Sequence, residues 1–372
     1  YSFRNYTNWG HLDPKQLTFA HLLRDAGYAT AIAGKWQLRG WDESPPRIVQ
    51  AGFQDYCAYV NEEESEKFAA PLGNQYWGGM YMSNGVAAKL DRYGDDVFTD
   101  MLVHFMKRNR EKPFLAYYCM GLMHRPFQPT PEHPQAPRAG QPAPESWMGL
   151  RGQAENFVPM LGYADRLVGK LLDALKELGL EQNTLVLFTG DNGTDNVIEA
   201  RNIRSRFLGQ EVRGGKYFPT ELGVNVPLLV RWPGRVNPGS VSKALVDFTD
   251  VLPSFADAAG AKLPPDYALD GRSFVPVLLG RAQAPKEFIY SWGNFEQSSK
   301  KYKEPQLHQE QWLHVVRDGR WKLYSDGRLF DTQSDFLEGK PVAPGTQPEA
   351  DAARARLKKQ LETLRKTQPR AW

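Results

Sequence analysis

Short apolar runs alternate along the chain with longer segments that are apolar on one side only. The runs lie at 28–33, 114–120, 184–189 and 226–232, and continuous apolar runs of this length are typical of strands buried on both faces of a sheet. The one-sided segments lie at 18–27, 95–110 and 161–180, where a spacing of three and four residues predicts helices. Helix followed by strand, repeated, predicts an α/β fold: a doubly wound, mostly parallel sheet flanked by helices.

After about residue 284 the pattern changes to short alternating strands at 288–292, 312–317, 320–324 and 328–330. Asp318-Gly319 and Asp326-Gly327 separate these segments and are strong hairpin signals. A charged helix is expected at 352–366. We therefore predict two domains, a large unit over 1–283 and a small C-terminal antiparallel α+β subdomain over 284–372.

The stretch from Pro126 to Trp147 contains seven prolines, which exclude a helix or a central strand. An extended loop is expected here, either an ordinary surface connection or a lid over a site.

Composition and charge exclude several classes of protein. The chain has 372 residues, of which 41% are hydrophobic and 24% charged, as in an ordinary globular protein. A net charge of +3 argues against nucleic acid as a necessary partner. Two cysteines, Cys57 and Cys119, exclude a disulfide scaffold or a cysteine zinc finger, and no apolar run reaches the length of a membrane span. The sequence begins at Tyr1 with neither an initiator Met nor a signal peptide. We therefore expect it to be cut from a longer sequence.

Polar residues follow three of the predicted strands, where open parallel sheets bind their ligands. They are Lys35, His124 and the Asp191-Asn192 pair, and Lys216 lies in a glycine-rich loop before a fourth strand. Carboxylate and amide oxygens suit a hard cation, and two lysines with a histidine suit a tetrahedral oxyanion. Each residue alone is more often solvated, in a turn or structural; their shared placement at strand ends strengthens the functional interpretation.

Four segments together resemble the sulfatases of the alkaline phosphatase superfamily. They are LRDAGYATAIAGKWQL at 23–38, LVLFTGDNG at 185–193, RGGKYFPTELGVNVPLLVRWPG at 213–234, and the pair DFTDVLPSFADAAG and LDGRSFVPVLLG within 246–280. The order of the motifs matches the family, and the resemblance covers essentially the whole chain. It implies an alkaline-phosphatase-like fold.

The resemblance also implies residue roles. Asp191 and Asn192 would bind a divalent cation, Ca²⁺ or Mg²⁺. Lys35 and Lys216 would hold sulfate oxygens, and His124 would protonate the leaving alcohol. The family's nucleophile is a formylglycine made from Cys or Ser in a C/S-x-P-S-R motif, which attacks sulfur as an aldehyde hydrate.

The chain departs from the family pattern at three places. The C/S-x-P-S-R motif and the family's N-terminal aspartate pair are absent, so both are expected upstream of residue 1 and the chain is expected to be an inactive fragment. Asp95-Asp96 begins a predicted helix, and we interpret the pair as capping rather than metal binding. Gln37 stands where many sulfatases have a histidine; we expect it to orient the formylglycine hydrate, because glutamine cannot act as a base near neutral pH.

These observations predict a sulfuric ester hydrolase that acts on a sulfated carbohydrate or aryl sulfate. A phosphoester or phosphonate hydrolase of the same superfamily, and a non-catalytic protein that binds sulfated glycans, stay open as alternatives. The resemblance implies a periplasmic or secreted protein. The sequence leaves the substrate and the oligomeric state undetermined.

Overall fold

The computed structural model describes residues 12–60, 73–138, 141–196, 198–281, 286–293 and 313–367. Its largest sheet has five strands in the order β4-β3-β2-β1-β5. The strands are β1 (Ala29–Lys35), β2 (Asp55–Tyr59), β3 (Met80–Ser83), β4 (Val86–Lys89) and β5 (Phe114–Cys119). β1 pairs in parallel with β2 and β5, whereas β3 pairs antiparallel with β2 and β4. The predicted α/β fold is confirmed, with parallel strands at the centre of a mixed sheet.

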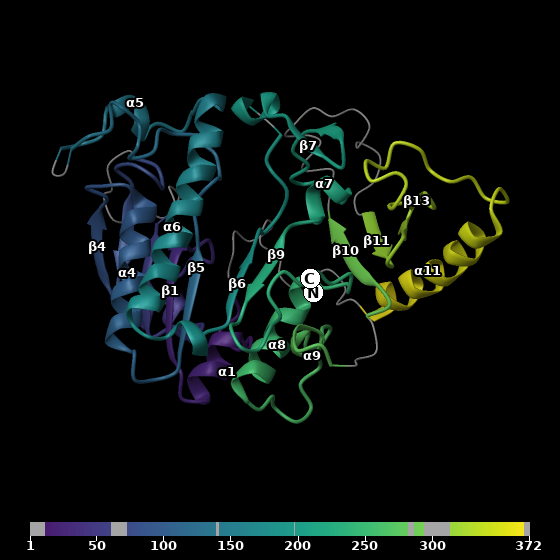
Figure 1. Cartoon of the computed structure of the whole chain (residues 1–372), viewed down its shortest axis with the longest axis horizontal. Coiled ribbons are helices and arrows are strands. Elements are labelled where there is room, and N and C mark those ends of the chain that lie inside the picture. Colours follow the sequence, from purple (N-terminus) through teal and green to yellow (C-terminus); the bar gives the residue numbers. More distant parts are fainter. Residues whose placement is uncertain are drawn as a thin grey trace.

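Strand β1 explains the two hydrophobic layers, because alternate side chains face opposite sides of the sheet. Ile32 packs in a core with helices α1 (Phe19–Asp25) and α8 (Val251–Ala259). Its neighbours Ala31 and Ala33 pack in a second core with α4 (Gly94–Arg108) and α6 (Phe157–Glu177). Figure 1 shows α4 and α6 side by side over the sheet. The central strands therefore read as nearly continuous apolar runs in the sequence.

The predicted helices are present with small changes at their ends. Thr18 caps α1, since its side chain accepts a hydrogen bond from the N–H of His21. Gly27, at φ +90°, follows the last turn of this helix, as expected for a helix end.

Two of the predicted strands are less buried than their apolar sequences indicated. β6 (Val186–Thr189) and β9 (Leu228–Arg231) form a separate antiparallel two-stranded sheet. Phe188 is 41% and Leu229 62% exposed, so the expectation of complete burial is wrong for this pair. Within the described part of the chain each pairs only with the other, and such a small sheet covers little apolar surface. β5, the outer strand of the large sheet, leaves Tyr117 39% exposed.

The start of the proline-rich stretch is buried and is not a surface connection. Phe127 has no exposed surface and packs beside Trp147 of the short helix α5 (Glu145–Met148). Its backbone carbonyl accepts hydrogen bonds from Asn156 Nδ2 at 3.0 Å and from the N–H of Gln153 at 2.9 Å. A neighbouring side chain and a neighbouring backbone N–H thus satisfy this carbonyl, which allows the burial.

The C-terminal unit is an antiparallel sheet covered by one helix, as predicted. Its strands are β10 (Ile289–Gly293), β11 (Leu313–Arg317), β12 (Trp321–Tyr324) and β13 (Leu329–Asp331), and its helix is α11 (Pro348–Thr367). The Asp-Gly pairs at 318–319 and 326–327 connect β11 to β12 and β12 to β13. Figure 1 shows this unit at the opposite end of the molecule from α4 and α6.

The predicted boundary near residue 284 falls outside the described residues. Among the described helices, none has both the length and the apolar character that a membrane crossing requires.

Candidate active site

Lys35 lies at the carboxyl end of β1, beside the end of β5. Gly34 pairs with Cys119 in the strand register, and its φ is +99°. A Cβ at Gly34 would come within 2.0 Å of the Cys119 carbonyl oxygen, so only glycine permits this close approach. The requirement for glycine places Lys35 directly at the edge where β5 ends.

His124 lies in the loop that follows β5, and two buried side chains fix this loop. Tyr76, which has no exposed surface, donates its hydroxyl proton to the carbonyl oxygens of Gly121 at 2.7 Å and His124 at 2.6 Å. Asp95 accepts hydrogen bonds from the N–H of Gly121 and the hydroxyl of Tyr118, both at 2.9 Å. Strand β5 and helix α4 therefore hold the backbone of the His124 loop.

Asp95 and Asp96 lie in the first turn of α4, as interpreted, but the hydrogen bonds of their carboxylates are to other elements rather than to the amides of this turn. Helix α4 has no side-chain hydrogen bond at its N-cap, and Asp95 instead anchors the loop before His124. The Tyr163 hydroxyl of α6 donates to Asp96 at 2.7 Å. One oxygen of each carboxylate thus binds a tertiary partner: Asp95 Oδ1 binds β5 and the loop after it, and Asp96 Oδ1 binds α6. Burial raises the pKa of Asp95 to about 7, although its two donors act in the opposite direction.

The loop after β6 carries Asp191 and Asn192, and it packs backbone against backbone on the loop that carries Lys216. The N–H of Gly193 donates to the Gly223 carbonyl at 2.9 Å, and the N–H of Lys216 donates to the Thr194 carbonyl at 3.1 Å. A Cβ at Gly193 would lie 1.9 Å from the Leu222 carbonyl oxygen. The glycines of these motifs therefore serve the contact between the two loops.

Lys216 is buried, and the backbone of the next residue is constrained. The Lys216 side chain is 8% exposed, and Nζ lies 5.5 Å from the ring centroid of Tyr217. Tyr217 has φ +78°, a region that residues with a side chain seldom occupy.

The charges of Lys35 and Lys216 act on each other and on the protonation of His124. Burial, with the nearby charge of Lys35, lowers the pKa of Lys216. Burial also lowers the pKa of Lys35, partly offset by the attraction of Asp191. The pKa of His124 falls to about 3 because the imidazole is buried and both lysines repel a proton there. The structure thus brings three of the predicted residues together beside Asp191 in a field that disfavours added positive charge.

The tautomer of His124 follows from its backbone partner. Nδ1 lies 2.6 Å from the Arg125 carbonyl oxygen, which can only accept a hydrogen bond. Nδ1 therefore carries the proton of the neutral ring, and a further proton would bind at Nε2.

An ion pair that the sequence did not indicate lies beside this cluster. Arg125 Nε donates to Asp195 Oδ2 at 2.7 Å, and the two side chains are 16% and 6% exposed. Asp195 also accepts the N–H of Asn196 at 2.7 Å. The pair joins the His124 loop to the loop of Asp191. The only signal in the sequence is that Arg125 and Asp195 neighbour predicted site residues, and no spacing rule connects positions 70 apart.

The predicted cation ligands, Asp191 and Asn192, offer two oxygen donors. Asp191 is exposed and Asn192 half-buried, and a carboxylate with an amide oxygen is the donor chemistry that Ca²⁺ or Mg²⁺ prefers. Within the described residues, no group of three or more His, Cys, Asp or Glu side chains forms a complete metal site. Gln37 is exposed on the turn after β1, and no contact described for it reaches the lysine–histidine cluster.

The two cysteines have the properties of unreactive thiols. Burial raises the pKa of Cys57 to about 11 and that of Cys119 to about 12. A thiol with such a pKa stays protonated near neutral pH and is a poor nucleophile.

Comparison with known proteins shows the family to which the chain is similar. The Sulfatase family model matches residues 1–261, and the model for the C-terminal region of N-sulphoglucosamine sulphohydrolase matches residues 215–367. The chain is 30% identical to arylsulfatase A of Bos taurus over 88% of its own length and 62% of the relative. It is 29% identical to steryl-sulfatase of Mus musculus over 77% of its length and 54% of the relative. It thus spans about half of the curated relatives that it matches.

Solved structures show the same fold. A protein crystallised with its substrate D-glucosamine-2-N,6-O-disulfate superposes with a TM-score of 0.71, at 21% identity over 96% of this chain and 83% of the other. A phosphonate monoester hydrolase of Silicibacter pomeroyi superposes with a TM-score of 0.62, at 20% identity over 98% and 82%. The family model covers well over half of the chain, and its match agrees with the fold. The chain belongs to the sulfatase family.

Proposed function

We propose that the full-length protein is a sulfuric ester hydrolase whose substrate is a sulfated carbohydrate or an aryl sulfate. The observation that carries this proposal is that the charges of Lys35 and Lys216 repel each other and together disfavour a proton on His124. The sulfate group of a bound ester, a tetrahedral monoanion, relieves this repulsion, and the half-buried surroundings strengthen its attraction to the lysines. The substrate class rests on family membership, and the relatives include an N-acetylgalactosamine-6-O-sulfatase of Bacteroides thetaiotaomicron at 27% identity.

In this proposal each residue acts at a stated atom. Lys35 and Lys216 donate hydrogen bonds from Nζ to sulfate oxygens and offset the negative charge on the leaving oxygen. His124 holds a proton at Nε2, which it gives to the leaving alcohol, while the Arg125 carbonyl keeps Nδ1 oriented. The negatively charged sulfate group of the substrate supplies the field that raises the pKa of His124 from its value in the unliganded site.

A divalent cation would be held by Asp191 and Asn192, together with ligands from outside the described residues. Such a cation polarises the sulfate oxygens and neutralises their charge. We assign the nucleophile, a formylglycine, to a part of the protein upstream of these 372 residues. The C/S-x-P-S-R motif does not occur in the printed sequence, and the thiols of Cys57 and Cys119 are unsuited to the task. Gln37 is proposed to orient the formylglycine hydrate.

The large unit over 1–283 would carry this chemistry, with 284–372 as a C-terminal subdomain. A periplasmic or secreted location is proposed on family grounds.

The test is an assay of the full-length protein on a panel of sulfated sugars and an aryl sulfate, with phosphate and phosphonate monoesters alongside. We expect turnover of sulfate esters, and a loss of at least a hundredfold in kcat/KM for Lys216→Ala and His124→Ala. Lys176→Ala, near the end of α6, is the control and should retain activity. Turnover of phosphorus esters alone would favour the phosphonate hydrolase alternative. Binding of sulfated glycans without turnover would favour the non-catalytic protein.

A further inference from the structure

Two cations face each other across the hairpin of β11 and β12. Arg317 and Lys322 are register partners, and like charges placed opposite each other destabilise a strand pair. Alternation along β12 turns Trp321 and Leu323 toward α11, where they join its hydrophobic core. Lys322 and Tyr324 point to the other face, which meets the large unit.

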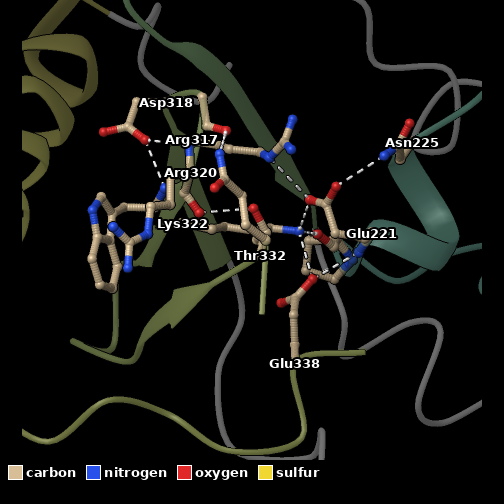
Figure 2. A network of polar contacts seen from close by, with 12 residues as sticks. Glu221, Asn225, Arg317, Asp318, Arg320, Lys322, Thr332 and Glu338 are labelled. Atoms are coloured by element: carbon tan, nitrogen blue, oxygen red, sulfur yellow. Dashed lines mark hydrogen bonds and ion pairs between the residues drawn. The ribbon is translucent and has the colours of Figure 1, made fainter. Parts of the chain in front are cut away.

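Carboxylates from two other segments balance the charges of these cations. Lys322 Nζ lies 3.1 Å from Glu221 Oε1 and 2.8 Å from Glu338 Oε1. Their side chains are 1%, 1% and 3% exposed. Arg317 Nε lies 3.4 Å from the same oxygen of Glu221. Figure 2 shows Lys322 between the two glutamates, with Glu221 reaching from a different part of the chain. A buried charge without its partner is strongly unfavourable, so these groups constrain one another's position.

The network also holds the backbone around helix α7 (Glu221–Val224). Glu338 Oε1 accepts the N–H of Glu221 at 2.7 Å, and Lys322 Nζ donates to the Pro219 carbonyl. The ring of Phe218 packs on the domain-facing core of the C-terminal sheet. The C-terminal unit therefore binds residues 218–221 by charge, by hydrogen bonds and by apolar contact.

The same segment carries Lys216. The N–H of Phe218 donates to the Gly215 carbonyl at 3.0 Å, so the chain makes a tight turn between Lys216 and the residues 218–221 that the C-terminal unit binds. On the side away from the C-terminal unit, the backbone N–H of Lys216 donates to the Thr194 carbonyl, and the Gly223 carbonyl accepts the N–H of Gly193. Residues 215–223 thus lie between the loop of Asp191 and the C-terminal sheet. A shift on either side moves Lys216.

We propose that Lys322 is a positioning residue of the active site: through Glu221 and Glu338 it fixes the segment that aims Lys216 at the sulfate group. The inference rests on the proposed function, because it assigns to Lys216 the holding of sulfate oxygens. The C-terminal unit would then help to position Lys216. An error of about 1 Å in the position of such a group can lower the rate a hundredfold.

A double-mutant cycle on the full-length protein tests this coupling. The variants are Lys322→Met, Lys216→Ala and their combination, and the measured quantities are the affinity for inorganic sulfate and the kcat and KM for an aryl sulfate. We expect Lys322→Met to weaken sulfate binding at least tenfold. In the Lys216→Ala background the same change should alter binding by less than twofold, because its effect acts through Lys216.

The matched control is Arg320→Met on the same hairpin. Arg320 pairs with Asp331 and Glu349, both at distances under 3 Å, and Figure 2 shows it away from Glu221. We expect its sulfate affinity to stay within twofold of the parent. Equal losses in Arg320→Met and Lys322→Met would show general damage to the C-terminal unit and would overturn the proposal.

Hydrogen exchange supplies a second readout and covers the case in which Lys322→Met does not fold. Glu338→Gln keeps the size of the side chain and removes its charge. In either variant, amides of 215–223 should exchange at least tenfold faster, whereas those of α4 should be unchanged. Unchanged amide exchange in 215–223 would overturn the proposal. So would losses of sulfate affinity in Lys322→Met and Lys216→Ala that simply multiply in the double variant. Full sulfate affinity in Lys216→Ala would instead contradict the proposed function itself.

Discussion

The backbone N–H of Lys216 donates to the Thr194 carbonyl oxygen at 3.1 Å. This bond joins the loop that carries Lys216, for which we propose a role in binding sulfate, to the loop that carries the candidate cation ligands. The position of Lys216 is therefore set by backbone geometry on one side and by the buried charges around Lys322 on the other. A flexible lysine held in this way loses less conformational entropy on binding a sulfate group.

Gly193→Ala should separate the two loops and lower kcat/KM of the full-length protein on a sulfate ester about a hundredfold. The added methyl would lie 1.9 Å from the Leu222 carbonyl oxygen, so the backbone has to move. The matched control is Gly162→Ala in α6, where no atom lies within 4 Å of the new methyl. It should stabilise the helix by about 0.5–1 kcal/mol and leave activity intact. Full activity in Gly193→Ala would show that the glycine contact does not position Lys216.

Asp95→Asn should change how stability depends on pH. The pKa of Asp95 is raised to about 7 in the folded protein, against about 3.9 in the unfolded chain. Between these values the folded state binds a proton that the unfolded state has released. The contribution to stability is therefore full below pH ~4 and is lost as pH rises through ~7.

The measurement is urea unfolding of parent and variant between pH 5 and 8. The parent should lose on the order of 3 kcal/mol relative to Asp95→Asn across this range. The difference in slope is the test, since the substitution also adds a constant offset from its amide group. Parallel stability curves would contradict the assignment of a raised pKa to Asp95.

Inorganic sulfate should raise the pKa of His124. The unliganded imidazole titrates at about 3 because burial and two nearby lysines disfavour its charge, and a bound dianion reverses the sign of the local field. Proton NMR of the His124 ring, recorded over a pH series with and without sulfate, should show the shift. His104, exposed on α4, is the control resonance and should not respond. An unchanged pKa of His124 at saturating sulfate would show that the anion binds elsewhere.

Calcium should stabilise the full-length protein through Asp191. A hundredfold excess over the dissociation constant corresponds to about 2.7 kcal/mol, which thermal unfolding with and without a chelator can detect. Asp191→Ala should abolish most of this gain, whereas Asp165→Ala, at an exposed position of α6, should retain it. An equal calcium response in parent and Asp191→Ala would remove Asp191 from the cation site.

Local periodicity and turn chemistry were enough to predict the long helices and the strands β1, β5, β6 and β9, but not β2, β3 and β4 of the large sheet. The run 28–33 became β1, and both Asp-Gly hairpins formed where predicted. The placement of Lys35, His124, Asp191 and Lys216 near strand ends also followed from local patterns. Lys35 and His124 follow the parallel neighbours β1 and β5, whose carboxyl ends lie at one edge. Asp191 follows β6 of a separate antiparallel pair, so its position beside them did not follow from this rule.

The partner of each charged residue depends on contacts between segments that are far apart in the sequence. Asp95 opens a helix in a pattern typical of capping, yet it binds the backbone of Gly121 in another element. Lys322 lies in an alternating strand where a solvated lysine is the usual outcome, yet it is buried between Glu221 and Glu338. Such pairs join residues as many as 101 positions apart. Their energy depends on burial and distance in three dimensions, which no local pattern of residues encodes.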